Sequence, residues 1–266
     1  MRVPQTWHNR FHFGLRRAAL GLYLGLAVAG PARAGGPLAV TTGGQPYRWD
    51  MSTPVRYVVD AGPLGPRTHD QAVAIVTQAV RTWESVPTAR ARFEAAGELT
   101  QDITGQNVVR FLNGLRPTDP SPILFDSDGS IVDKLLGAGA SRGVYGVGAV
   151  FLADRASGRI QVGFVVLNGR SLAEFSDAFA LWDGTHEIGH MLNLDHSQVN
   201  RDEVFDGDPT NDALAAVMCY RGPNADGSLS QDDQAWVSWL YPSADFTAST
   251  GSIQGRVLLP DGQQTG

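Results

Sequence analysis

Hydrophobic and polar residues follow regular periods in the first half of the chain, and each period predicts an element. Residues 55–60 alternate and are rich in β-branched side chains, which predicts a strand. Residues 68–84 carry apolar side chains at helical spacing, and Thr68 with Gln71 matches a capping box, which predicts a helix. Residues 107–112 have the composition of a second strand.

The second half of the chain adds a hairpin and two helices. Residues 147–153 and 159–167 have the pattern of two strands on either side of a turn. Residues 171–192 predict a helix with an aromatic apolar side. Residues 230–240 predict another helix, with Ser230 and Asp233 as a cap pair. Because strands alternate with helices while one hairpin is antiparallel, we expect an α+β fold with an α/β-like layer and a mixed sheet.

The beginning of the chain has the pattern of a secretory signal peptide. Four arginines precede an apolar run at residues 18–29, and Ala32-Arg33-Ala34 then matches an A-x-A cleavage site. The run is 12 residues long, whereas a membrane-spanning helix needs about 20, so a retained membrane anchor is the less favoured alternative. We therefore expect residues 1–34 to be a signal peptide and the protein to be secreted.

Composition divides the rest of the chain into four parts. Residues 35–53 form a short N-terminal segment ahead of one main domain at residues 54–242. Residues 243–251 turn to Ser, Thr and Ala, the composition of a linker. Residues 252–266 resemble the first strand and turn of the β-sandwich modules called carboxypeptidase regulatory-like domains. They are either the start of such a domain in a longer protein or an ordinary C-terminal tail.

Charge and cysteine content narrow the class of protein. The chain is 42% hydrophobic and 18% charged, which is typical of a folded globular protein. Five of its 21 basic residues lie in residues 1–34, so 16 would remain against 27 acidic residues after cleavage, a net charge of −11. Nucleic acid is therefore not an expected partner. Cys219 is the single cysteine, so the chain cannot form an internal disulfide.

Three histidines at a distinctive spacing are the strongest candidates for chemistry. His186 and His190 lie four residues apart on the predicted helix, about 40° of rotation and roughly 6 Å of rise from each other, so both can reach one metal ion. On the same straight helix His196 would lie some 15 Å away, so the chain must bend before it. Asn193 tolerates the left-handed conformation that such a bend often needs.

Glu187, beside the first histidine, predicts catalysis rather than a structural role for the metal. Three neutral imidazoles leave a tetrahedral zinc ion with one open position for water. Zinc lowers the pKa of that water toward about 7, and Glu187 would accept its proton as it attacks a peptide carbonyl. Scattered core or surface histidines are the alternative, but three of the six histidines of the chain fall at this spacing.

The segment of residues 186–196 resembles the metzincin zinc peptidases, whose pattern is H-E-x-x-H-x-x-G-x-x-H followed by a Met-turn. The resemblance covers roughly residues 54–242, and it departs from the pattern at Asn193, where the family has Gly. It implies a mixed sheet with an active-site helix, a backing helix and a C-terminal helix. It also implies a Met-turn at residues 216–220, with Met218 as an apolar floor under the zinc.

Neighbouring residues resemble different metzincin families. Ser197, directly after the third histidine, and the helix ending in Trp83-Glu84 resemble the matrixins. Tyr220, two residues after Met218, instead resembles the astacins and serralysins. In those families the matching tyrosine ligates zinc or stabilises the transition state, and a core tyrosine is the alternative.

Two other segments are candidate binding sites. Asp126, Asp128 and Asp133 are closely spaced carboxylates around a Gly turn, a composition that suits calcium, although a solvated turn is the alternative. The strand at residues 147–153 is apolar and bordered by Gly, as expected if an extended substrate adds to it as a further strand. An ordinary sheet strand has the same pattern.

Together these features predict a secreted zinc-dependent endopeptidase that acts on proteins or peptides, with Zn²⁺ as cofactor and Ca²⁺ as a second candidate ion. The main alternative is a catalytically silent secreted module for zinc binding or adhesion. Glu187 disfavours it, because a purely structural zinc site has no use for a base. Hydrolysis of a non-protein amide would share the same chemistry and differ only in the cleft.

Overall fold

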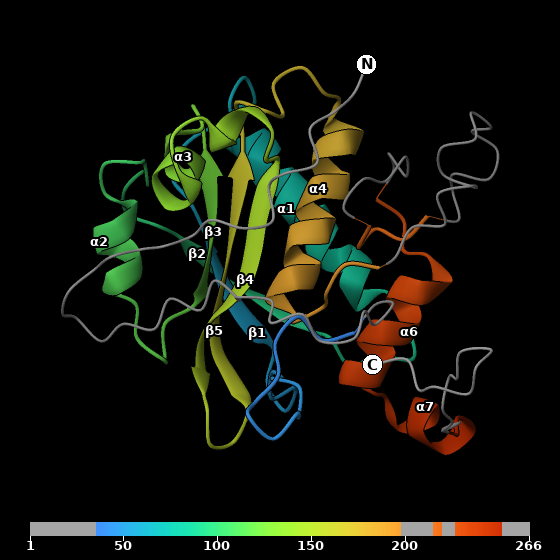
Figure 1. Cartoon of the computed structure of the whole chain (residues 1–266). Helices are drawn as coiled ribbons and strands as arrows, with labels where there is room; N and C mark the ends of the chain where they lie inside the picture. Colours follow the sequence, from blue (N-terminus) through green and yellow to red (C-terminus); the bar gives the residue numbers. More distant parts are fainter. Residues whose placement is uncertain (1–35, 198–214, 220–226, 252–266) are drawn as a thin grey trace, which may run out of the picture.

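A five-stranded mixed sheet forms the centre of the fold, with strand order β2-β1-β3-β5-β4 (Figure 1). The computed structural model describes residues 36–197, 215–219 and 227–251. The strands pair in parallel except for β4, which runs antiparallel to β5 at one edge. The strands are β1 (Val55–Val59), β2 (Phe93–Glu98), β3 (Ser121–Asp126), β4 (Gly146–Asp154) and β5 (Arg159–Asn168).

Helices cover both faces of this sheet. In Figure 1, α1 and α4 lie side by side on one face, while α2 and α3 lie on the other. The helices are α1 (His69–Glu84), α2 (Val108–Asn113), α3 (Ser130–Leu136), α4 (Asp177–Met191), α6 (Gln231–Leu240) and α7 (Ala244–Ser249), with a short 3-10 turn at Ala140–Arg142. The expected α+β class with a mixed sheet is therefore confirmed.

The hydrophobic core is split in two by the sheet, because successive side chains of a strand point to opposite faces. In β3, Ile123 and Phe125 pack with α1 and α4, whereas Leu124 packs with α2 and α3. In β5, Val165 and Val166 divide in the same way. Both central strands are consequently buried on both sides, and α4 is held against a rigid layer.

Several elements lie where their sequence patterns predicted them. The strand at residues 55–60 is β1, and the predicted hairpin is formed by β4 and β5. The side chain of Thr68 caps α1, and the capping box with Gln71 is complete. Ser230 caps α6 in the same manner, together with Asp233.

Two predicted elements differ in the structure. The strand prediction for residues 107–112 is wrong, because this segment forms helix α2. Its buried side chains, Val108 and Leu112, lie four residues apart and so occupy one face of a helix, which the β-branched composition concealed. The helix predicted for residues 171–192 begins only at Asp177, where Ser176 caps it.

The sequence patterns did not predict strands β2 and β3 or helices α3 and α7. Helix α7 lies inside the stretch of linker composition at residues 243–251, so that composition did not predict local structure there.

Two predicted segments lie outside the described residues. They are the signal peptide at residues 1–34 and the first strand of a possible further domain at residues 252–266. Within the described ranges, no helix combines the length and hydropathy needed to span a membrane.

Candidate metal centre

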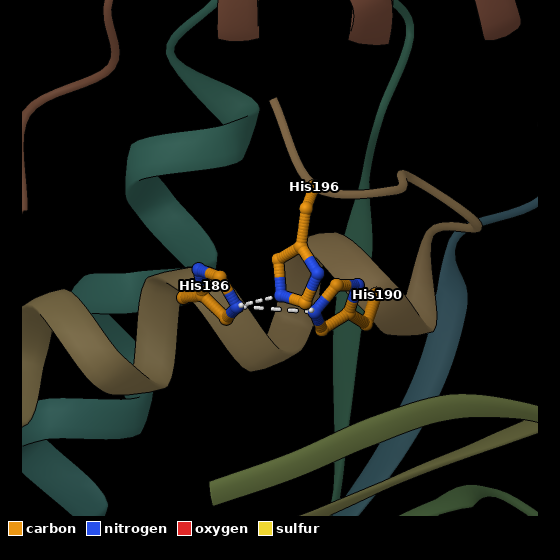
Figure 2. A group of neighbouring side chains, drawn as sticks. All are labelled: His186, His190 and His196. Carbon is orange, nitrogen blue, oxygen red and sulfur yellow. Dashed lines mark hydrogen bonds between the residues drawn. The ribbon is translucent and has the colours of Figure 1, made fainter. Parts of the chain in front are cut away.

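Three imidazole rings converge on one point at the surface of α4 (Figure 2). His186 and His190 project from adjacent turns of the helix, and His196 reaches back from the segment that follows it. Their Nε2 atoms lie 3.0 Å apart for His186 and His190, and 3.2 Å from each of these to His196. Within the described residues, this is the only group of three ligating side chains close enough to hold a metal ion.

Backbone carbonyls determine which ring nitrogens face the centre. Nδ1 of His186 lies 2.7 Å from the carbonyl oxygen of Val217, and Nδ1 of His190 lies 2.8 Å from that of Leu194. A carbonyl oxygen can only accept a hydrogen bond, so each Nδ1 carries the proton and donates it. Both Nε2 atoms then present lone pairs to the centre, which is the arrangement typical of metal-binding histidines.

The donor set fits a zinc ion. Nitrogens bound to one tetrahedral zinc at about 2.0–2.1 Å are about 3.3 Å from each other, close to the observed spacing. Burial and the neighbouring His190 lower the pKa of His186, and burial lowers that of His190 to about 4. The two rings are therefore neutral at physiological pH, as metal ligation requires. His196 is the exposed member of the group.

The end of α4 turns the chain so that the third histidine can join the first two. Asn193 is the one described residue other than Gly with a positive φ, at 71°. Its N–H donates to the carbonyl of His190, and the N–H of Leu194 donates to that of Gly189. These two bonds form a Schellman motif with a left-handed residue after the helix. The turn expected at Asn193 is thus present, and it replaces the Gly of the metzincin pattern without loss of geometry.

Met218 packs against α4 at Gly189, the residue before the second histidine. Its residue is 2% exposed, and its sulfur faces Gly189. The Met218 carbonyl accepts a hydrogen bond from the Ser197 N–H, which ties this turn to the residue after His196. The preceding carbonyl, at Val217, is the one that orients His186. The turn that contains Met218 therefore holds the His186 ring directly and the chain next to His196 through Ser197.

Asp233 binds the backbone of the same turn through its carboxylate, a role that no local sequence pattern indicates. Its carboxylate accepts hydrogen bonds from the N–H groups of Val217 and Met218, at 2.8 and 3.1 Å. It also accepts the N–H of Ser230 as part of the cap of α6. The capping pattern was visible in the sequence, but the second use of the carboxylate depends on a contact 16 residues away.

Glu187 lies beside the metal site and against the edge strand. It is 6% exposed, and a Cβ added to Gly146 of β4 would come within 2.6 Å of its Cγ. A Cβ at Gly148 would overlap the backbone of Glu187, so these glycines allow α4 to approach β4 closely. Burial, and then the nearby Asp183 carboxyl, raise the pKa of Glu187 well above its ordinary value.

Asp183 is a second buried carboxyl at this site that sequence analysis missed. It lies one helical turn before Glu187 and is 2% exposed. Its Oδ2 atom would be 2.9 Å from a Cβ at Gly146, and it is buried without a hydrogen-bond partner in the described part of the chain. Burial raises the pKa of Asp183, which favours its protonated form beside Glu187.

The candidate calcium ligands are used in other ways. Asp126 is buried and accepts the N–H groups of Ile131 and Val132 at the start of α3. Asp128 accepts the N–H of Ser130, and Asp133 that of Ser141. Each of these carboxylates accepts a separate backbone donor, and the three do not gather into one group in the described residues, so calcium binding stays a prediction.

The other predicted site features are placed only in part. Tyr220 lies outside the described residues, so its predicted role stays a prediction. The apolar strand of residues 147–153 is β4, an edge strand that pairs with β5 and runs alongside α4.

Comparisons with models of known protein families and with curated proteins find no match for this chain. Membership of the metzincins is therefore a proposal that rests on the residues of the site.

Proposed function

We propose that the protein is a secreted zinc-dependent endopeptidase of the metzincin type, with His186, His190 and His196 as ligands and Glu187 as general base. The observation that carries this proposal is a buried carboxyl, Glu187, that directly follows His186 on the helix that supplies two of the three converging imidazoles. A structural metal site would gain nothing from a desolvated carboxyl beside it.

In this proposal the metal ion and Glu187 have separate roles. When bound, a zinc ion with three imidazole ligands supplies Lewis-acid activation of water and of a carbonyl group. Glu187 accepts the proton of the attacking water on its carboxylate and passes it to the leaving amine nitrogen.

The edge strand supports a protein or peptide substrate. Among the described residues, β5 is the one strand that hydrogen-bonds to β4, so the other edge of β4 can pair with an extended chain. Its glycines place it directly against Glu187. A peptide that adds to β4 would therefore run past the general base, which is the geometry expected for cleavage within a chain.

The proposal is tested with the whole chain and two variants. Glu187→Ala removes the base, and Glu174→Ala is the matched control, since Glu174 is exposed and precedes α4. For each protein, bound zinc is measured by elemental analysis, and cleavage of unfolded casein is followed with and without a chelator. We expect zinc in all three, and chelator-sensitive cleavage at least 100-fold slower in Glu187→Ala than in the other two.

Two results would contradict the proposal. Zinc without cleavage in the parent protein and the control would favour a silent binding module. Cleavage that persists in Glu187→Ala would remove the carboxyl from the mechanism. Secretion is tested separately by N-terminal sequencing of protein recovered outside the producing cells, which should begin at Gly35; a chain that keeps residues 1–34 would contradict it.

A further inference from the structure

The side chain of Asn193 makes three hydrogen bonds to a distant part of the chain. Its Oδ1 accepts the N–H of Ala39 at 2.8 Å, and its Nδ2 donates to the carbonyls of Ala39 at 2.9 Å and Tyr47 at 2.8 Å. The residue is 0% exposed. A glycine could adopt the same φ, but it could make none of these three bonds.

The backbone of the turn at residues 193–195 is paired with residues 36–38, next to the residue that the Asn193 side chain binds. The N–H of Leu38 donates to the Asn193 carbonyl at 2.9 Å, and the N–H of Asp195 donates to the carbonyl of Gly36 at 2.8 Å. Pro37 and Leu194 face each other in an antiparallel bridge. Residues 36–39 thus add a short strand along the three residues that lead into His196.

Two aromatic side chains, Trp49 and Tyr241, bind carbonyl groups at the end of α4. The indole Nε1 of Trp49 donates to the Met191 carbonyl at 2.9 Å. The hydroxyl of Tyr241, which lies after α6, donates to the Leu192 carbonyl at 2.6 Å. Carbonyls at a helix end have no partner within the helix, so these bonds satisfy groups that would otherwise be buried without one.

We propose that Asn193 is a positioning residue that couples docking of the N-terminal segment, residues 36–49, to metal binding. The segment fixes residues 193–195, and these fix both the Leu194 carbonyl that orients His190 and the position of His196. Binding and docking are then reciprocal: metal stabilises the docked segment by the same factor by which the docked segment strengthens metal binding. The inference rests on the metal site of the proposed function and not on peptide hydrolysis.

Two variants break the contact from opposite sides. Asn193→Gly keeps the positive φ and removes all three side-chain bonds, while Ala39→Pro removes the N–H that reaches Asn193 and leaves the turn itself untouched. Asn113→Gly, at an exposed helix end, is the matched control for the first. We expect zinc affinity, measured by chelator competition, to fall at least tenfold in each of the two, with the control unchanged. The double variant should lose less than the two single losses combined.

Hydrogen exchange provides a readout that does not depend on activity. In the parent protein, added zinc should slow exchange of the Leu38 and Ala39 amides, and in Asn193→Gly this protection should be lost. Cobalt-substituted protein should show an altered visible spectrum in the same variant, because the third ring is no longer held. Equal zinc affinity in the parent and both variants, or equal zinc-dependent protection of these amides, would overturn the coupling even if the protein proves to be a peptidase.

Discussion

The sulfur of Met218 lies against Gly189, and a side chain at position 189 would collide with it. A Cβ at position 189 would overlap that sulfur and come within 2.9 Å of the Trp83 ring. Glycine therefore lets the methionine pack directly under the helix that carries His186 and His190. The contact links two parts of the chain that both hold the metal site, and it makes the size of one side chain critical.

Substitution of this glycine is expected to destabilise the protein, in contrast to its neighbour on the same helix. Gly189→Ala should lower the free energy of unfolding by about 1–3 kcal/mol through overpacking. At Gly184 a Cβ would lie 3.7 Å from its nearest neighbours, an ordinary contact. Gly184→Ala should therefore stabilise the protein by about 0.5–1 kcal/mol through helix propensity. Chemical denaturation measures the free energy of unfolding of both variants. A Gly184→Ala variant less stable than the parent protein would contradict the prediction that position 184 has room for a Cβ.

Loss of the Asp233 carboxylate should weaken both the fold and the metal site. Asp233→Ala would leave the buried N–H groups of Val217 and Met218 without acceptors, at about 1–3 kcal/mol each. Because the Val217 carbonyl orients His186, zinc affinity should fall as well. Gln231→Ala, exposed in the first turn of the same helix, should change the free energy of unfolding by less than about 0.5 kcal/mol. Equal zinc affinity in both variants would contradict the supporting role of the Met218 turn.

Asp60 should make the stability depend on pH in a defined window. Burial raises the pKa of Asp60 to about 6, from an ordinary value of 3.8, against the N–H donors of Ile103 and Phe125 that lower it. Between these values the folded protein binds a proton that the unfolded chain has released, so the contribution of Asp60 to stability is complete below about pH 4 and is lost as the pH rises through about 6.

The variant Asp60→Asn tests this window because it cannot titrate. From pH 4 to pH 7, its free energy of unfolding relative to the parent protein should rise by about 3 kcal/mol, at roughly 1.4 kcal/mol per pKa unit. Urea unfolding followed by tryptophan fluorescence, at equal zinc concentration, gives the difference at each pH. A difference that does not vary with pH would show that Asp60 stays ionised in the folded state.

Local patterns predicted those elements whose stability is decided locally. The capping boxes at Thr68 and Ser230 and the hairpin of β4 and β5 are recognisable from neighbouring residues alone. Residues 107–112 were misread because two adjacent valines suit a strand, while the packing of a six-residue helix depends on partners elsewhere. The sequence does not predict β2, because it is a mostly exposed edge strand without an alternating pattern.

The same distinction separates the parts of the metal site. The spacing of His186, His190 and His196 could be read from 11 consecutive residues, and so could the bend at Asn193. The groups that hold these rings could not. The Val217 carbonyl is 31 residues from His186, and the Ala39 amide is 154 residues from Asn193, so no local pattern reveals these contacts.

These long sequence separations have a consequence for the order of folding. Contacts between distant residues close large loops, and the entropy of closure must be met before the contacts stabilise anything. The pairing of Ala39 with Asn193 encloses most of the domain, so we expect it to form after the sheet and its helices have assembled. We therefore expect the three rings to take their final positions in one of the last steps of folding, when residues 36–39 pair with residues 193–195.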